Sequence, residues 1–171
     1  MLELQVLAMA PCLSSAFMKP QIKLAEAKTP EGETLELYEH DGDMYISANG
    51  EFLMTSRAYG SEEELGRMAC QPFRAARQPV VLIGGLGMGF TLRAVLESVP
   101  QTKAKIIVAE IIPEVVDWNR THLDKFHKGL LDDPRVGLKI GPVQESTFHV
   151  ARPGVGAGSK VHPVASSKLV A

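Results

Sequence analysis

Four glycines stand within six residues directly after a β-branched apolar run, in the segment VVLIGGLGMGFTLRAVLES at 80–98. An apolar segment with helical spacing follows at once. A strand that ends in glycines and leads into a helix brings backbone N–H groups and a helix N-terminus to the carboxyl edge of a sheet. Glycine suits such a turn because a Cβ atom would block the close approach of a ligand. The segment therefore predicts a turn that binds the polar part of a small molecule.

The spacing of the glycines narrows the ligand class. The dinucleotide pattern G-x-G-x-x-G needs glycine or alanine where this chain has Phe90 or Leu92, so it fails in both registers. The pattern G-x-G-x-G fits at Gly85, Gly87 and Gly89. No Lys-Ser or Lys-Thr pair follows, which excludes a P-loop. Two possibilities stay open for this turn: a nucleoside with a tail other than a pyrophosphate, or no ligand.

A carboxylate completes the pattern. Glu110 ends the strand-like run KIIVAE, about twenty residues beyond the glycines. A carboxylate at the end of a second parallel strand points over the first turn and can accept both hydroxyls of a ribose. The alternative is a tight strand–helix turn with a surface glutamate.

The segments that must position the glycine turn and Glu110 form two regions of the sequence. Between residues 22 and 55, short apolar-alternating runs are separated by HDGD and NG, which favour tight turns with positive φ and predict a small antiparallel meander. These runs carry Leu35, Leu37, Tyr45, Phe52 and Met54.

The second region alternates strand and helix. Ser61 with Glu64 three positions later predicts a capping box for a helix over 62–69. The further expected elements are strands at 80–83, 105–110 and 136–140, a helix at about 90–99, and a helix that begins near Pro113 and has Val116 and Leu123 on its apolar face. This order predicts an α/β fold with a Rossmann-like parallel sheet, preceded by the antiparallel β region.

The expected organisation has four segments. They are an N-terminal extension (1–21), the antiparallel β region (22–60), a partial Rossmann-like core (61–141) and a tail (142–171). The tail is rich in Gly, Ser, Pro and Ala without a sustained period, so we expect it to be disordered. Three strands make only half of a doubly wound sheet, and the sheet is expected to be cut short.

The composition argues against nucleic-acid binding, metal binding, a membrane span and secretion. The 171 residues carry a formal net charge of −2, which gives no electrostatic reason to expect a nucleic-acid partner. Cys12 and Cys70 lie far apart without CxxC spacing, and His122 and His127 lie off a shared helical face, so no metal site is expected. No run is long and apolar enough to span a membrane, and Glu3 argues against a secretory signal, so a cytoplasmic location is expected.

Three segments carry a family resemblance: VVLIGGLGMGFTLRAVL, IIVAEIIPEVVDWNRTHL and DDPRVGLKIG. Over residues 30–141 the chain resembles the class I S-adenosylmethionine-dependent methyltransferase-type fold, most closely its spermidine synthase (polyamine aminopropyltransferase) branch. The resemblance implies S-adenosylmethionine or decarboxylated S-adenosylmethionine as co-substrate and a role in polyamine biosynthesis. Gly85, Gly87 and Gly89 would surround the methionine-derived part, Glu110 would hold the ribose, and Ile111 would lie near the adenine.

The sequence also departs from the family pattern. Met88 and Ile112 stand where relatives usually carry Asp, and Pro142 follows Gly141 where relatives show Gly-Asp. The acidic motif that would activate the amine has no counterpart in QESTFHVARPGVG. A premature end or an altered reading frame near residue 142 is our hypothesis for this difference. No catalytic residue is assigned, although Tyr59 is a candidate for lining the site, with loop packing as its alternative.

Three functions stay open. The first is a spermidine synthase-like transferase, and the second is a methyltransferase that uses S-adenosylmethionine. The third is a non-catalytic nucleoside-binding or truncated module. The expected partners are a small-molecule amine or methyl acceptor and a second copy of the chain in a homodimer, because the edge of the third strand is expected to be unpaired.

Overall fold

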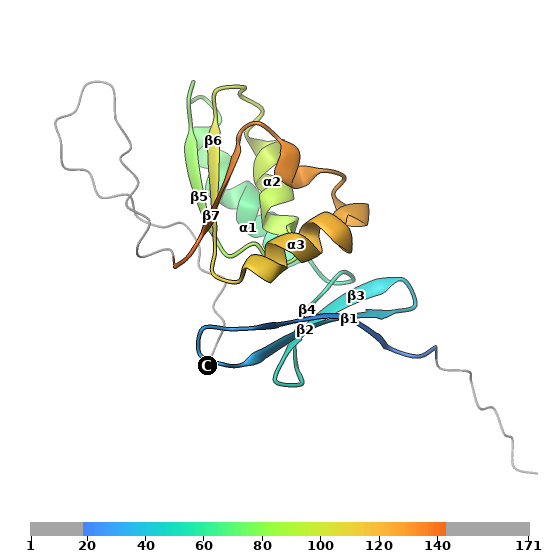
Figure 1. Ribbon diagram of the computed structural model, residues 1–171. Helices are drawn as coiled ribbons and strands as arrows, with labels where there is room; N and C mark the ends of the chain where they lie inside the picture. The colour runs from blue at the N-terminus through green and yellow to red at the C-terminus, as the bar shows by residue number, and fades with distance from the viewer. Residues whose placement is uncertain (1–18, 143–171) are drawn as a thin grey trace, which may run out of the picture.

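The computed structural model describes residues 19–142, which form two sheets and three α-helices (Figure 1). The first sheet is an antiparallel meander in the order β1-β2-β3-β4. Its strands are β1 (Ile22–Lys28), β2 (Thr34–His40), β3 (Asp43–Ala48) and β4 (Glu51–Thr55). The predicted meander is thereby confirmed. Most of the N-terminal extension and all but the first residue of the predicted tail lie outside the described residues.

The two dipeptides that predicted tight turns adopt the backbone that such turns require. Asp41 and Gly42 have φ of 53° and 86°, and Asn49 and Gly50 have φ of 50° and 81°. Two successive residues with positive φ match the twist of the flanking strands. The Asp41–Gly42 turn, which connects β2 to β3, sets the register that pairs Leu37 with Ile46.

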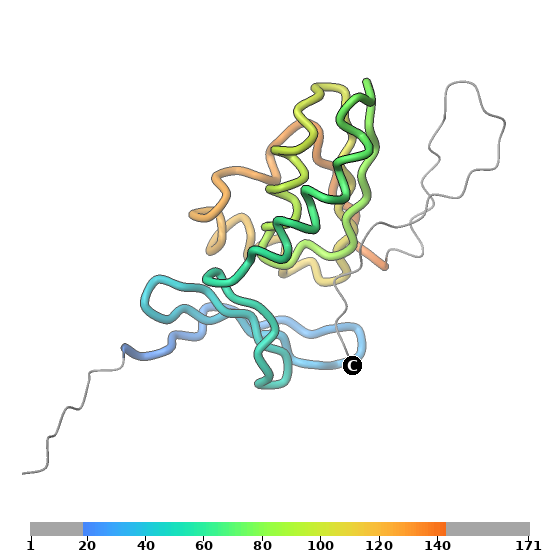
Figure 2. The backbone as a smooth tube through the Cα atoms, turned by 180° about the vertical axis from the view of Figure 1, so that it is seen from behind, coloured from blue at the N-terminus to red at the C-terminus, as the bar shows by residue number. Residues whose placement is uncertain are grey.

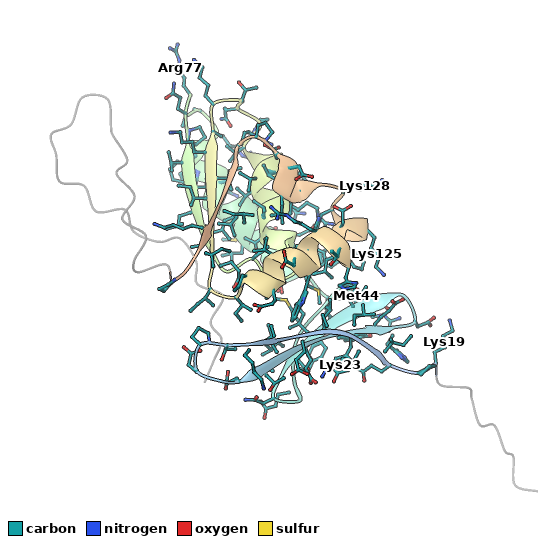
Figure 3. All side chains as sticks on the ribbon, in the orientation of Figure 1. Lys19, Lys23, Met44, Arg77, Lys125 and Lys128 are labelled. Atoms are coloured by element: carbon teal, nitrogen blue, oxygen red, sulfur yellow. The ribbon has the colours of Figure 1, made fainter. Side chains whose placement is uncertain are left out.

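One face of the meander is buried and turned toward the helices. Leu35, Leu37, Met44 and Ile46 have at most 4% of their surface exposed, and Figure 3 places Met44 between β3 and the helical layer. Tyr45 lies on the opposite face, where its ring meets that of Phe52 edge-on at 5.9 Å. Phe52 is 61% exposed, so this strand position does not belong to the core.

The second sheet is parallel, in the order β5-β6-β7, as predicted. The elements of this part are α1 (Gly60–Cys70), β5 (Val80–Gly84), α2 (Phe90–Ser98), β6 (Lys105–Glu110), α3 (Pro113–Thr121) and β7 (Val136–Ile140). Short 3₁₀ turns lie at Gln71–Phe73 (η1), Asp124–Phe126 (η2) and Leu130–Asp132 (η3). The α/β expectation is confirmed.

All three helices cover one face of the parallel sheet (Figure 1). Figure 2, from the opposite side, shows the chain leaving the meander, running through α1 and entering β5. The core between sheet and helices includes Ile106 and Val108 of β6, Leu92 of α2 and Trp118 of α3, each less than 5% exposed. Trp118 therefore packs in the core.

The predicted capping box is wrong. Helix α1 begins at Gly60, one residue before Ser61, and its N-cap residue is Tyr59. Ser61 lies inside the first turn, where its hydroxyl donates to Glu62 Oε2 at 2.6 Å. Within the described part of the chain, no side chain caps α1.

Replacing Ser61 with alanine should therefore change the free energy of unfolding by less than about 0.5 kcal/mol, as at an ordinary surface position. Removal of a true N-cap costs about 1 kcal/mol. Urea unfolding measures this difference. Asn49→Ala is the positive control, because the Asn49 amide oxygen accepts from Thr34 N at 2.9 Å. If Ser61→Ala lowered the free energy of unfolding as much as Asn49→Ala, Ser61 would be a cap of α1 after all.

Helix α3 is shorter than the sequence predicts. Pro113 occupies the first turn and Val116 is buried, as expected, but the helix ends at Thr121. Leu123 is fully buried two residues further on, as the N-cap residue of η2, and its N–H donates to Trp118 O at 2.9 Å. None of the helices between residues 19 and 142 has the length and apolar character that a membrane crossing requires.

Candidate functional site

The predicted glycine turn lies at the carboxyl edge of the parallel sheet, between β5 and α2. Gly85, Gly87 and Gly89 have φ of 82°, 54° and 82°, a region that residues with a Cβ rarely adopt. Gly85 N donates to Ala109 O at 2.7 Å and so continues the β5–β6 pairing into the turn. The glycines are needed for the shape of this turn whatever it binds.

The Glu110 side chain is directed at the turn. It is 5% exposed, and its Oε2 accepts from Leu86 N at 2.7 Å while its Oε1 accepts from Ile112 N at 2.9 Å. The carboxylate therefore joins the turn after β5 to the start of α3. An ionised carboxylate has about four lone-pair positions, so two remain for donors from a ligand.

Two of the glycines also meet side chains. A Cβ on Gly87 would lie 3.0 Å from the methyl carbon of Met54, and a Cβ on Gly89 would lie 3.0 Å from Asn119 Oδ1 and 3.1 Å from His127 Cδ2. Gly89 is thus required for packing against the segment that follows α3. At Gly87 the neighbour is the far end of a flexible Met54 side chain from β4, which can move for a ligand.

At two positions the sequence has an apolar residue where spermidine synthases usually carry Asp, and both residues are buried. Met88 is 1% exposed and Ile112 is 4% exposed, so both side chains belong to the core. Ile111, the residue expected near an adenine, is 38% exposed just after Glu110. Gly141, with φ of 134°, donates from its N–H to Glu110 O at 2.8 Å. The residues expected to surround a nucleoside therefore meet at one edge.

Tyr59 belongs to an aromatic cluster. Its ring stacks on Phe90 with centroids 4.2 Å apart, and the Arg93 guanidinium lies 5.1 Å from the centroid of each ring. Arg93 also forms an ion pair with Glu63 and donates to Phe126 O at 2.8 Å. The cluster ties α1 to α2 and η2, which favours the packing alternative for Tyr59.

The Glu63–Arg93 pair makes stability depend on pH. The hydrogen bond from Arg93 holds the pKa of Glu63 below its ordinary value of 4.5. A carboxyl whose folded pKa is lowered contributes stability above its unfolded pKa and loses it as pH falls through the folded pKa. Between pH 7 and pH 3, we therefore expect the wild-type protein to lose more free energy of unfolding than Glu63→Gln, by about 1 kcal/mol. The prediction would be contradicted if urea unfolding showed the same loss of free energy of unfolding in the wild-type protein and in Glu63→Gln.

A second group of side chains, Asn119 and His127, lies beside the turn and was not predicted from the sequence. Asn119 is fully buried, and its Nδ2 donates to Gly87 O at 2.7 Å and to Val115 O at 2.8 Å. His127 Nε2 lies 3.0 Å from Asn119 Oδ1. The sequence held one sign of this group, because Asn119 is a polar residue on the apolar face of α3 that also carries Val115 and Val116.

The described residues hold no group of three or more His, Cys, Asp or Glu side chains arranged for a metal ion. Cys70 is a free, buried thiol whose pKa is raised by burial. It is part of the core between α1 and the sheet.

Comparisons with known proteins find similarity to aminopropyltransferases. The chain matches no protein-family model. It is 40% identical over 74 residues to polyamine aminopropyltransferase 1 of Hyperthermus butylicus, a match that covers 43% of this chain and 25% of that relative. A spermidine synthase crystallised with the transition-state analogue AdoDATO matches 70% of the chain at 26% identity, with a TM-score of 0.55. The spermidine synthase of Thermotoga maritima matches at 24% identity with a TM-score of 0.56.

The α/β part thus has the partial Rossmann-like fold of these enzymes. Over the residues that match, the chain is spermidine synthase-like. It spans 25% of the length of the curated relative and 41% of the structure bound to AdoDATO.

Proposed function

We propose that the glycine turn binds S-adenosylmethionine or decarboxylated S-adenosylmethionine. In this proposal Gly85, Gly87 and Gly89 surround the sulfur-bearing part, Glu110 accepts the ribose hydroxyls, and Ile111 packs on the adenine. The observation that carries it is the position of the Glu110 carboxylate, 2.7 Å from the N–H of Leu86 in the turn.

The chemistry that follows is transfer of an aminopropyl group. A neutral amine attacks the carbon beside the sulfonium, the carbon–sulfur bond breaks toward sulfur, and the amine proton passes to a base. Alignment of the two reactants supplies much of the rate. Among residues 19–142 we assign no base, so the proposed function is binding of the donor, with transfer to a small amine as the reaction it serves.

Methyl transfer is the second candidate, and Met88 favours it. A buried thioether side chain occupies the place of the acidic residue expected in aminopropyltransferases. Without that carboxylate the turn offers less to a ligand that lacks the methionine carboxylate and carries an extra net positive charge. A nucleoside-binding module without turnover is the third candidate. For all three, the cytoplasm remains the predicted location.

Calorimetric titration of the full chain with three nucleosides separates these candidates. Tightest binding of decarboxylated S-adenosylmethionine supports aminopropyl transfer, and tightest binding of S-adenosylmethionine supports methyl transfer. Binding of methylthioadenosine alone supports a module without turnover. If none of the three binds at millimolar concentration, the proposed function is wrong.

A further inference from the structure

Helix α3 contacts the glycine turn through the side chain of Asn119. This side chain is fully buried, and its Nδ2 donates to Gly87 O at 2.7 Å and to Val115 O at 2.8 Å. Val115 lies one turn earlier in α3, so the second bond stays within the helix. The first bond joins α3 to the turn after β5. Asn119 is therefore a direct link from the third helix to the backbone of the proposed nucleoside site.

His127 fixes the orientation of the Asn119 amide. Because Nδ2 donates to two carbonyls, Oδ1 is the atom that faces His127, whose Nε2 lies 3.0 Å away. An amide oxygen can only accept, so Nε2 must carry a proton and donate it to this oxygen. Nε2 carries a proton in the charged ring and in one neutral tautomer, so this bond does not depend on the charge of the ring, which the nearby Arg93 and Asp124 influence. A reversed amide would place two donors against each other.

The carbonyl of Gly87 depends on this link. Glu110 Oε2 accepts from Leu86 N at 2.7 Å, and Gly89 N donates to Leu86 O at 2.9 Å, so the two ends of the turn are fixed by other bonds. Among residues 19–142, Gly87 O accepts from Asn119 and from no other donor, and Gly87 N has no acceptor. Gly87 has a φ of 54°, and glycine reaches this region and others with similar ease. Without Asn119, the carbonyl of Gly87 is free to turn.

We propose that Asn119 is a positioning residue of the nucleoside site, which holds the carbonyl of Gly87 toward α3 and so keeps the glycine turn in its binding shape. The inference rests on the proposed function. Asn119 acts through Gly87 and does not touch the nucleoside. When only a fraction of the molecules has the binding shape, the dissociation constant of every nucleoside rises by the same factor. This equal factor distinguishes a positioning residue from one that contacts a particular group of the nucleoside.

The test is calorimetric titration of the full chain with S-adenosylmethionine and with decarboxylated S-adenosylmethionine. Asn119→Asp keeps an oxygen for His127 but has no N–H for Gly87 O. Asn119→Ser has a hydroxyl that reaches Val115 O, four residues earlier in the helix, but is too short for Gly87 O. We expect each variant to weaken binding about tenfold, because the lost bond lowers the population of the binding shape. The factor should be the same for both nucleosides in Asn119→Ser, which adds no charge.

Gln101→Met is the matched control. Gln101 Nε2 also donates to two backbone carbonyls, those of Arg74 and Ala76, each at 3.1 Å. Gln101 lies before the first residue of β6, at the opposite edge of the parallel sheet from the glycine turn. We expect Gln101→Met to leave both affinities unchanged. Circular dichroism checks that each variant is folded at the titration temperature.

Amide NMR of the ¹⁵N-labelled variants separates positioning from a general loss of stability. Without nucleoside, substitution of Asn119 should shift or broaden the resonances of Gly87 and Met88. Saturation with the nucleoside should return these resonances toward their positions in the wild-type complex, because binding selects the same shape of the turn.

Several results would overturn the inference. They are unchanged affinity in the folded Asn119 variants, an equal loss in Gln101→Met, and unequal losses for the two nucleosides in Asn119→Ser. Resonances of Gly87 and Met88 that are unaltered in the free variants, or that stay displaced at saturation, would also overturn it, as would unfolding of both Asn119 variants. In each of these cases the wild type still binds, so the proposed function stands. If the wild type binds neither nucleoside, the proposed function fails and the inference fails with it.

Discussion

Decarboxylated S-adenosylmethionine is expected to bind about 100-fold more weakly after Glu110→Gln. A charged carboxylate that accepts a hydroxyl contributes about 1.5–3 kcal/mol, and about 2.8 kcal/mol corresponds to 100-fold in affinity. The amide of glutamine also cannot accept from both Leu86 N and Ile112 N, which Glu110 now does. The loss should appear in the dissociation constant measured by calorimetry.

The same substitution leaves one buried N–H without an acceptor, so the free energy of unfolding should fall by about 1–3 kcal/mol. Circular dichroism at the titration temperature must therefore show that the variant is folded. Glu114→Gln is the matched control, because Glu114 is exposed on α3 four residues further along. Unchanged affinity in folded Glu110→Gln, or an equal loss in Glu114→Gln, would remove Glu110 from the site.

Gly66→Ala is expected to destabilise the fold by about 1–3 kcal/mol, although alanine is the better helix former. A Cβ on Gly66 would lie 2.9 Å from Thr91 O and 2.9 Å from Ala94 Cβ. Both atoms belong to α2, and a backbone oxygen of a helix cannot move aside by itself. Helices α1 and α2 must therefore separate, and α2 carries the glycine turn at its start.

Gly60 provides the matched control for this prediction. It lies in the same helix, and a Cβ there would meet no described atom within 4 Å. Gly60→Ala should leave stability unchanged or raise it by about 0.4–1 kcal/mol. Urea unfolding gives the free energy of unfolding of both variants. Equal values for Gly66→Ala and Gly60→Ala would mean that α1 and α2 are not packed this closely.

The sequence predicted the elements where local rules and tertiary packing agree. The positive-φ pairs at Asp41–Gly42 and Asn49–Gly50 are set by the turn itself, and the strand that ends at Glu110 is set by its apolar run. The approach of Glu110 to the glycine turn follows from parallel pairing of β5 with β6. Each of these predictions follows from the local sequence together with the general rule that buried strands alternating with helices pair in parallel.

The remaining features depend on contacts that spacing does not encode. Ser61 and Glu64 have the spacing of a capping box, but the stack of Tyr59 on Phe90 fixes the residue before the helix and starts α1 at Gly60. The hydrogen bond between Asn119 and His127 joins residues on either side of the end of α3. No periodicity of the sequence brings those two residues together.

We propose that the turn after β5 and the end of β6 hold a sulfur-bearing nucleoside. Backbone amide NMR of the ¹⁵N-labelled full chain, titrated with decarboxylated S-adenosylmethionine, tests it most directly. We predict that the largest shifts fall on Gly85, Leu86, Gly87 and Ile111, and that Glu110→Gln needs about 100-fold more ligand to produce the same shifts. Saturable shifts confined to other parts of the chain, or none at millimolar ligand, would contradict it.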